Sequence, residues 1–161
     1  MNEQHSFGGM KTADLELLVQ RHEAKGATDR PLYLAAKQEL ARRATGQLSL
    51  EITLNHLRQY AAKGTFTTYG AVAAASGIEW RLARRPMPRH LEQVLEECWK
   101  REWPLLSALC VNATEVQTGE LSGTSLDGFV AGVERVTGRR IDNSKAFLKQ
   151  TQRECFEWAR N

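Results

Sequence analysis

The chain contains few cysteines and no long hydrophobic run. Its 161 residues include three cysteines, Cys98, Cys110 and Cys155, with no two close in sequence. We therefore expect three reduced, mostly buried thiols in a cytoplasmic protein. No apolar run approaches the roughly 20 residues of a membrane span, so no membrane partner is expected. Residues 1–10 lack the apolar core of a secretory signal and are predicted to form a disordered tail.

Motifs for metal, cofactor or covalent chemistry are also scarce. There is no glycine-rich phosphate loop. The segment His90-Leu91-Glu92 matches half of a zinc-deaminase signature, but the Pro-Cys-x-x-Cys half is absent. The cysteines and His90 lack the spacing of a structural zinc site. We therefore predict no catalytic residue, no metal site and no cofactor.

The composition is that of a soluble globular protein. Hydrophobic residues make up 42% of the chain and charged residues 25%, which excludes a collagen, a low-complexity segment or a disordered chain. Lysine and arginine total 22 against 19 aspartate and glutamate, so the net charge is +3. This mild excess permits nucleic-acid binding without establishing it, so the clustering of the charges matters more than their sum.

Apolar spacing and capping signals predict a mainly α fold with a small β element. The apolar run from Leu105 to Val111 suits a buried strand, and Pro86 and Pro88 predict a turn or loop up to Pro88. We expect a single compact unit in four parts: the tail 1–10, a helical region 11–63, a winged-helix-like core 64–138 and a C-terminal helix 139–161. The expected helices cover about 14–25, 31–44, 49–63, 68–77, 88–101, 125–137 and 144–159.

The middle of the chain has the order helix, turn, helix, strand. This order is typical of a winged helix-turn-helix, in which the second helix enters a groove of duplex DNA. By pattern alone, two ordinary packed helices without a partner explain it better. A run of four arginines within nine residues, at the turn before the second helix, shifts the balance toward nucleic acid. We predict phosphate contacts from Arg84, Arg85 and Arg89, and base or groove contacts from Tyr69, Trp80, Arg81 and His90.

The segment Thr68–Gly77 resembles the opening of the C-terminal domain of the O6-alkylguanine-DNA alkyltransferases and alkyltransferase-like proteins. In that family a recognition helix follows, then a proline and an apolar strand, a glycine-containing stretch and a last helix. In this chain the apolar strand corresponds to Pro104–Asn112, and the parts after it correspond to Thr118–Gly123 and Gly128–Gly132. The resemblance therefore covers about residues 66–136. The chain is also similar to small bacterial proteins that lend it no function.

The resemblance implies a winged-helix DNA-binding surface with Tyr69 at the family's helix-start tyrosine, which approaches the DNA. The family also holds a flipped base in a pocket beside the wing. The family's reactive Pro-Cys-His-Arg-Val motif is replaced by Leu109-Cys110-Val111-Asn112. Because Cys110 has no neighbouring base or cation in the sequence to hold a thiolate, alkyl transfer is not expected.

The leading hypothesis is a non-enzymatic protein that binds double-stranded DNA and senses an altered base or regulates transcription. One alternative is a protein-interaction module in which the basic turn meets an acidic partner and Trp99 with Trp103 anchors the contact. The other is a small nucleic-acid-acting enzyme, which is less favoured because no paired carboxylates or metal ligands are visible.

Overall fold

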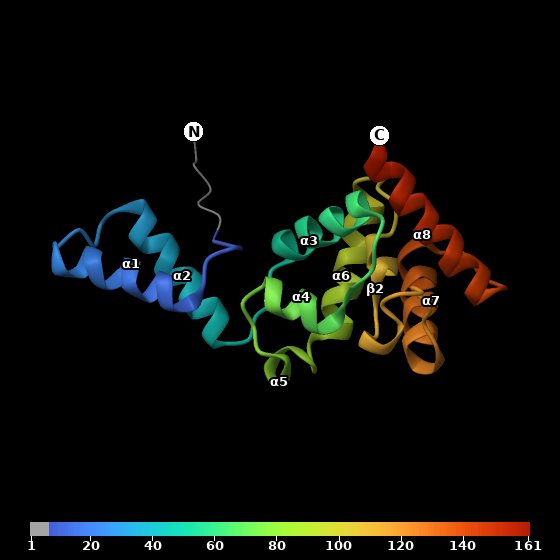
Figure 1. Cartoon of the computed structure of the whole chain (residues 1–161), viewed down its shortest axis with the longest axis horizontal. Helices are drawn as coiled ribbons and strands as arrows, with labels where there is room; N and C mark the ends of the chain where they lie inside the picture. The colour runs from blue at the N-terminus through green and yellow to red at the C-terminus, as the bar shows by residue number, and fades with distance from the viewer. Residues whose placement is uncertain (1–6) are drawn as a thin grey trace.

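The structure is a computed structural model that describes residues 7–161 (Figure 1). Residues 1–6, part of the predicted tail, lie outside the described residues. Among the described helices, none is both long and apolar enough to cross a bilayer. In chain order the elements are α1 Thr12–Ala24, α2 Pro31–Ala44, α3 Leu50–Lys63, β1 Thr67–Thr68, α4 Tyr69–Ala75, α5 Trp80–Ala83, α6 Met87–Lys100, the 3-10 helix η1 Leu106–Leu109, β2 Cys110–Val111, the 3-10 helix η2 Ala113–Glu115, α7 Gly123–Thr137 and α8 Ser144–Arg160.

The expected helices are confirmed to within two residues at each end, and the fold is mainly α with a small β element. Local signals explain this agreement. Thr68 Oγ1 accepts a hydrogen bond from the Ala71 amide at 3.1 Å, and Asn143 caps α8 in the same way. Gly64 ends α3 with a φ of 68°, a left-handed conformation that glycine adopts without steric cost.

The predicted strand Leu105–Val111 is wrong over most of its length. Residues Leu106–Leu109 form η1, and only Cys110–Val111 is extended, pairing in parallel with β1 in the register Thr67 to Cys110. A short apolar run has no periodicity that separates a strand from a buried helical turn, and this run packs against α3, α6 and α8. Because the strands are parallel, the pair is not the antiparallel hairpin of a wing.

The stretch before Pro88, predicted as turn or loop, contains the short helix α5. Its residues Trp80–Ala83 follow Glu79, which has the extended backbone of an N-cap position. The prolines lie after this turn of helix, so they do not interrupt it. Instead, Pro88 occupies the first turn of α6, where no intrahelical donor is lost. The arginine-rich segment therefore runs from α5 through a turn at residues 84–86 into α6.

Buried apolar side chains form two clusters. The smaller one belongs to α1 and α2, which extend from the rest of the molecule as a helical hairpin (Figure 1), and includes Leu15, Tyr33 and Ala36. The larger one is shared by α3 to α8 and contains η1 at its centre, with Leu106 and Leu109 fully buried. The hairpin therefore has its own apolar contacts, and a polar network joins it to the rest.

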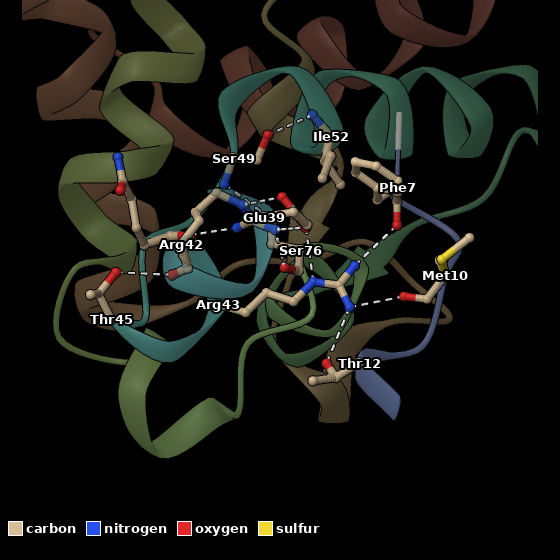
Figure 2. A network of polar contacts seen from close by, with 11 residues as sticks. Phe7, Met10, Thr12, Glu39, Arg42, Arg43, Thr45, Ser49, Ile52 and Ser76 are labelled. Carbon is tan, nitrogen blue, oxygen red and sulfur yellow. Dashed lines mark hydrogen bonds and ion pairs between the residues drawn. The ribbon is translucent and has the colours of Figure 1, made fainter. Parts of the chain in front are cut away.

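Arg42, near the end of α2, makes that connection, and its neighbour Arg43 holds the N-terminal segment against the hairpin (Figure 2). The buried guanidinium of Arg43 donates to the carbonyl oxygens of Phe7 at 3.0 Å and Met10 at 2.9 Å, while Arg42 donates to the Ser76 carbonyl at 2.6 Å. The last four residues of the predicted tail are thus held against α2, which corrects that prediction for the described part. The physical reason is Phe7, whose ring is buried in the hairpin cluster.

Candidate nucleic-acid interface

A pocket lies between the first half of α6 and the inner face of α7, beside the start of α4 and β2. Its cavity volume is about 590 Å³. Buried apolar side chains form its interior, and exposed charged side chains lie around its opening. The residues that line it are Tyr69, Trp80, Arg84, Met87, Pro88, Arg89, Leu91, Glu92, Leu95, Ser107, Cys110, Leu121, Thr124, Ser125, Gly128, Phe129, Gly132 and Arg135.

Two glycines of α7 shape the pocket, and they lie on one face of the helix because they are four residues apart. A β-carbon built on Gly128 would have no heavy atom within 4 Å, so this residue leaves open space. A β-carbon on Gly132 would lie 3.0 Å from Leu95 Cδ1 of α6. The two helices therefore approach closely at Gly132 and leave room at Gly128.

Of the predicted phosphate contacts, Arg84 and Arg89 line the pocket, and Arg85 is exposed between them in sequence. Among residues 7–161, none of these three side chains forms an ion pair. Arg81 is also exposed, and its Nε donates to Glu79 at 2.7 Å. An exposed pair of this kind is weak, so the cation stays available to an anion.

Besides Glu79, which pairs with Arg81, a second carboxylate lies among these cations. Glu92 of α6 accepts hydrogen bonds from Arg135 of α7, with Nε 2.9 Å from Oε1. The Arg135 hydrogen bond, opposed by burial and helped by the charges of Arg135 and Arg89, lowers the pKa of Glu92. Glu92 therefore stays ionised and offsets part of the positive charge at the opening.

Tyr69 and Trp80, the predicted aromatic contacts, both line the pocket from different helices. Tyr69 is the first residue of α4 and is partly buried. Burial and the nearby Cys110 raise the pKa of Tyr69 to about 12 against an opposing hydrogen bond with Ser125. Its hydroxyl is therefore protonated at neutral pH. Trp80 is the first residue of α5 and leaves much of its indole exposed, where it can stack on a flat ring.

His90 is not at this surface, which corrects its assignment as a base or groove contact. Its side chain points into the core and is 5% exposed, with Nε2 2.7 Å from Thr53 Oγ1 of α3. Burial lowers the pKa of His90 to about 4, so the ring is neutral at pH 7. It follows Arg89 in sequence, but successive helix residues point about 100° apart, so the arginine is exposed and the histidine buried.

Two further residues line the pocket that were not among the predicted site residues. Cys110 lies at the inner end, and burial raises the pKa of its thiol far above the ordinary range, so it carries no thiolate. Ser107 also lines the pocket, and its Oγ has no hydrogen-bond partner. The signal for Ser107 was a polar residue inside the otherwise apolar run from Leu105 to Val111.

The tryptophans of the protein-interaction hypothesis lie at the other end of α6. Trp99 is exposed in the last turn of the helix, with the Arg139 guanidinium 5.4 Å from its ring centre. Trp103 packs against Trp158, with ring centres 5.2 Å apart, and is partly buried. Because α6 is about 20 Å long at 1.5 Å per residue, the basic turn and these rings lie at opposite ends of the helix.

Neither a metal site nor a related protein adds to this description of the pocket. Within residues 7–161 no group of three or more His, Cys, Asp and Glu side chains is placed to hold a metal ion. Comparison of the chain with known protein families, with curated proteins and with solved structures gave no match.

Proposed function

We propose that this protein is a non-enzymatic binder of double-stranded DNA that holds an altered base in the pocket between α6 and α7. One observation carries the proposal: exposed arginines stand at the opening of a largely apolar pocket that is large enough for a nucleobase. Cations at the opening would meet the phosphates on either side of the base, while apolar walls would surround the base itself.

The proposed docking is of helix-turn-helix type, with α6 as the recognition helix. Arg84, Arg85 and Arg89 would contact phosphates, and their side chains project from the turn before α6 and from its first turns. The loop from Asn112 to Ser122 would take the place of a wing, since it adjoins the pocket through Leu121. The proposed winged-helix type of binding would thus use this loop where an antiparallel hairpin is usual, since β1 and β2 are parallel.

The walls of the pocket support a base as its occupant. Phe129 and Leu95 are buried apolar residues that can cover a flat ring, and Trp80 offers a stacking surface at the opening. Tyr69 lies at the start of α4 with a protonated hydroxyl. An altered base is favoured because a mismatched or damaged base costs less to extrude from the duplex than a paired one.

The state of Cys110 supports a binding role rather than a transfer reaction. Nucleophilic attack requires a thiolate, which in proteins is held by a neighbouring cation, base or helix N-terminus. Here burial dominates and raises the pKa of the thiol. The arginines that could stabilise a thiolate are at the exposed end of the pocket.

Fluorescence anisotropy over a salt series tests the proposal with two labelled duplexes, one intact and one carrying an O6-alkylguanine. We expect salt-sensitive binding to both and tighter binding to the modified duplex. Equal affinities for the two duplexes would indicate a general DNA binder whose pocket does not hold the altered base. No binding even at low salt would overturn DNA binding, and a nuclease-resistant protein complex in a pull-down would then favour the protein-interaction module.

A further inference from the structure

A second, smaller cavity lies between the loop residues 118–122 and the first half of α8. Its volume is about 250 Å³, and we refer to it as the α8 cleft. Leu121 lines both this cleft and the pocket between α6 and α7, and every other lining residue differs. The α8 cleft is therefore a separate site, with its own side chains to bind an occupant.

Gln152 lines the α8 cleft and is only 5% exposed. Its Nε2 donates hydrogen bonds to two backbone carbonyl oxygens, that of Ala108 at 2.9 Å and that of Gly119 at 2.7 Å. Only the amino half of the amide can donate to two acceptors, so these bonds fix which way the amide is turned. The other half, Oε1, is therefore an acceptor that faces away from both carbonyl groups.

The Oε1 atom of Gln152 has no hydrogen-bond partner in residues 7–161, but it is not sealed inside the protein. Among the fully buried side-chain nitrogen and oxygen atoms of these residues, only Ser107 Oγ lacks a partner. Gln152 Oε1, which also lacks one, is therefore accessible to solvent. Because Gln152 lines the α8 cleft and exposes so little surface, Oε1 offers its free acceptor to an occupant of that cleft.

Two lysines give the α8 cleft its charge. Lys145 and Lys149 are four residues apart, so they lie on one face of α8, and both are exposed. Within residues 7–161 neither forms an ion pair. Glu120 is the one acidic side chain of the lining, so two cations face one carboxylate. The start of α8 adds partial positive charge, and the cleft therefore attracts an anion.

The remaining side-chain surface of the α8 cleft is largely apolar. Leu121 and Leu148 are 4% and 3% exposed and line it from the loop and from α8. An occupant that matches all of these surfaces has an anionic end, an apolar body and an N–H or O–H donor. At about 250 Å³ the cleft lies just below the usual size of ligand pockets, roughly 300–1,000 Å³, so it suits one small molecule.

We propose that the α8 cleft binds a mononucleotide, with its phosphate at Lys145 and Lys149 and its base against the two leucines. An amino group of the base donates to Gln152 Oε1. A phosphate monoester carries up to two negative charges at neutral pH, which matches two ammonium groups better than a carboxylate does. Because Gln152 Nε2 is already engaged, the cleft selects a base that has a donor at this edge. The inference does not depend on the proposed function.

NMR titration of the isotope-labelled protein with adenosine 5′-monophosphate tests the inference. We expect the amide signals of residues 118–122 and 145–152 to shift with increasing nucleotide. Purine riboside 5′-monophosphate, which lacks the amino group, should bind about fivefold more weakly because Gln152 Oε1 then stays without a partner. The ligand is changed rather than Gln152, since replacing this residue would also break its two bonds to the backbone.

A pair of lysine substitutions tests the phosphate end. Lys145→Gln with Lys149→Gln should weaken binding of adenosine 5′-monophosphate at least about tenfold and leave binding of adenosine unchanged. The matched control is Lys25→Gln with Lys100→Gln, which removes the same charge from exposed positions outside the cleft. We expect the control to bind the nucleotide as the wild type does.

Four results would each overturn the inference. They are no shift in the cleft at millimolar nucleotide, equal affinities for the two nucleotides, equal losses in the two double variants, and inorganic phosphate binding as tightly as the nucleotide. Shifts confined to the pocket between α6 and α7 would overturn it as well. The measurements use no duplex, so the inference and the proposed function fail separately.

Discussion

Arg135 and Glu92 join α7 to α6 across the opening of the pocket, with the Arg135 guanidinium donating to the Glu92 carboxylate at 2.9 Å. The pair does two things at once. It connects the two helices that form the walls, and it places a negative charge among the arginines that would meet phosphate. The wild-type protein therefore has weaker attraction for an anion at this point than its arginines alone would provide.

Replacing that carboxylate tests its effect on binding. Glu92→Gln frees Arg135 and removes the opposing charge, so we expect about two- to fivefold tighter DNA binding at low salt, a gain of about 0.4–1 kcal/mol, because exposed pairs of charges are screened. The measurement is anisotropy at several salt concentrations. Glu96→Gln, on an exposed position of the same helix outside the pocket, is the matched control. Weaker binding of Glu92→Gln than of the control would contradict the prediction.

The arginine assignment predicts a change in the salt dependence. Arg84→Ala with Arg85→Ala should weaken binding to all sequences and reduce the slope of log affinity against log salt by about 1.8, since each phosphate contact contributes about 0.9. The control is Arg139→Ala with Arg140→Ala, which removes the same charge beyond the end of α7. An unchanged slope in the first variant would remove these two arginines from the interface.

Because His90 is buried as a neutral ring, the protein is expected to lose stability in acid. Burial lowers the pKa of His90 to about 4, below its ordinary value of 6.5, so the unfolded chain takes up a proton at a higher pH than the folded protein does. Stability from this group is complete above pH 6.5 and is lost as the pH falls toward 4, by on the order of 3 kcal/mol.

Denaturant unfolding of wild type and His90→Gln at pH 7 and at pH 4.5 measures this effect. The neutral variant should lose less stability between the two pH values than the wild type does. Burial, with a smaller effect of Lys63, also lowers the pKa of His56, so part of the acid sensitivity remains in the variant. Equal losses in the two proteins would show that His90 does not titrate as its position implies.

A side chain at Gly119, in the loop beside the pocket, is expected to lower the stability of the protein. Its φ is 73°, and a β-carbon there would lie 2.2 Å from Phe66 Cζ. Gly64 has nearly the same φ, 68°, and no heavy atom within 4 Å of its β-carbon position. We expect Gly64→Ala to cost about 1 kcal/mol of stability from backbone strain alone, and Gly119→Ala at least about 2 kcal/mol more because of the clash.

Unfolding curves of both alanine variants check this difference. A second substitution, Phe66→Leu in the Gly119→Ala protein, should recover part of the lost stability by making room for the methyl group. Equal costs at the two glycines would mean that the loop moves away from Phe66 without penalty.

The sequence by itself determined the seven longer helices, but not α5 or η1, because the signals of the longer helices are local. Apolar residues repeat at helical spacing, Thr68 and Asn143 cap the helix that follows each of them, and Gly64 ends α3. The arginine run was visible for the same reason, since charge clustering needs no knowledge of the fold. The sequence also placed Tyr69 and Trp80 among the candidate contacts, and both line the pocket.

Only the tertiary structure decided how the apolar run from Leu105 to Val111 folds, and which way His90 points. Both depend on neighbours that are distant in the chain: η1 packs against α3, α6 and α8, and His90 meets Thr53 of α3. The pocket also depends on distant segments. It forms because α6 and α7 approach closely at Gly132 and leave open space at Gly128. Local sequence sets backbone preferences, whereas burial, close approach and unpaired polar groups exist only after distant segments have packed together.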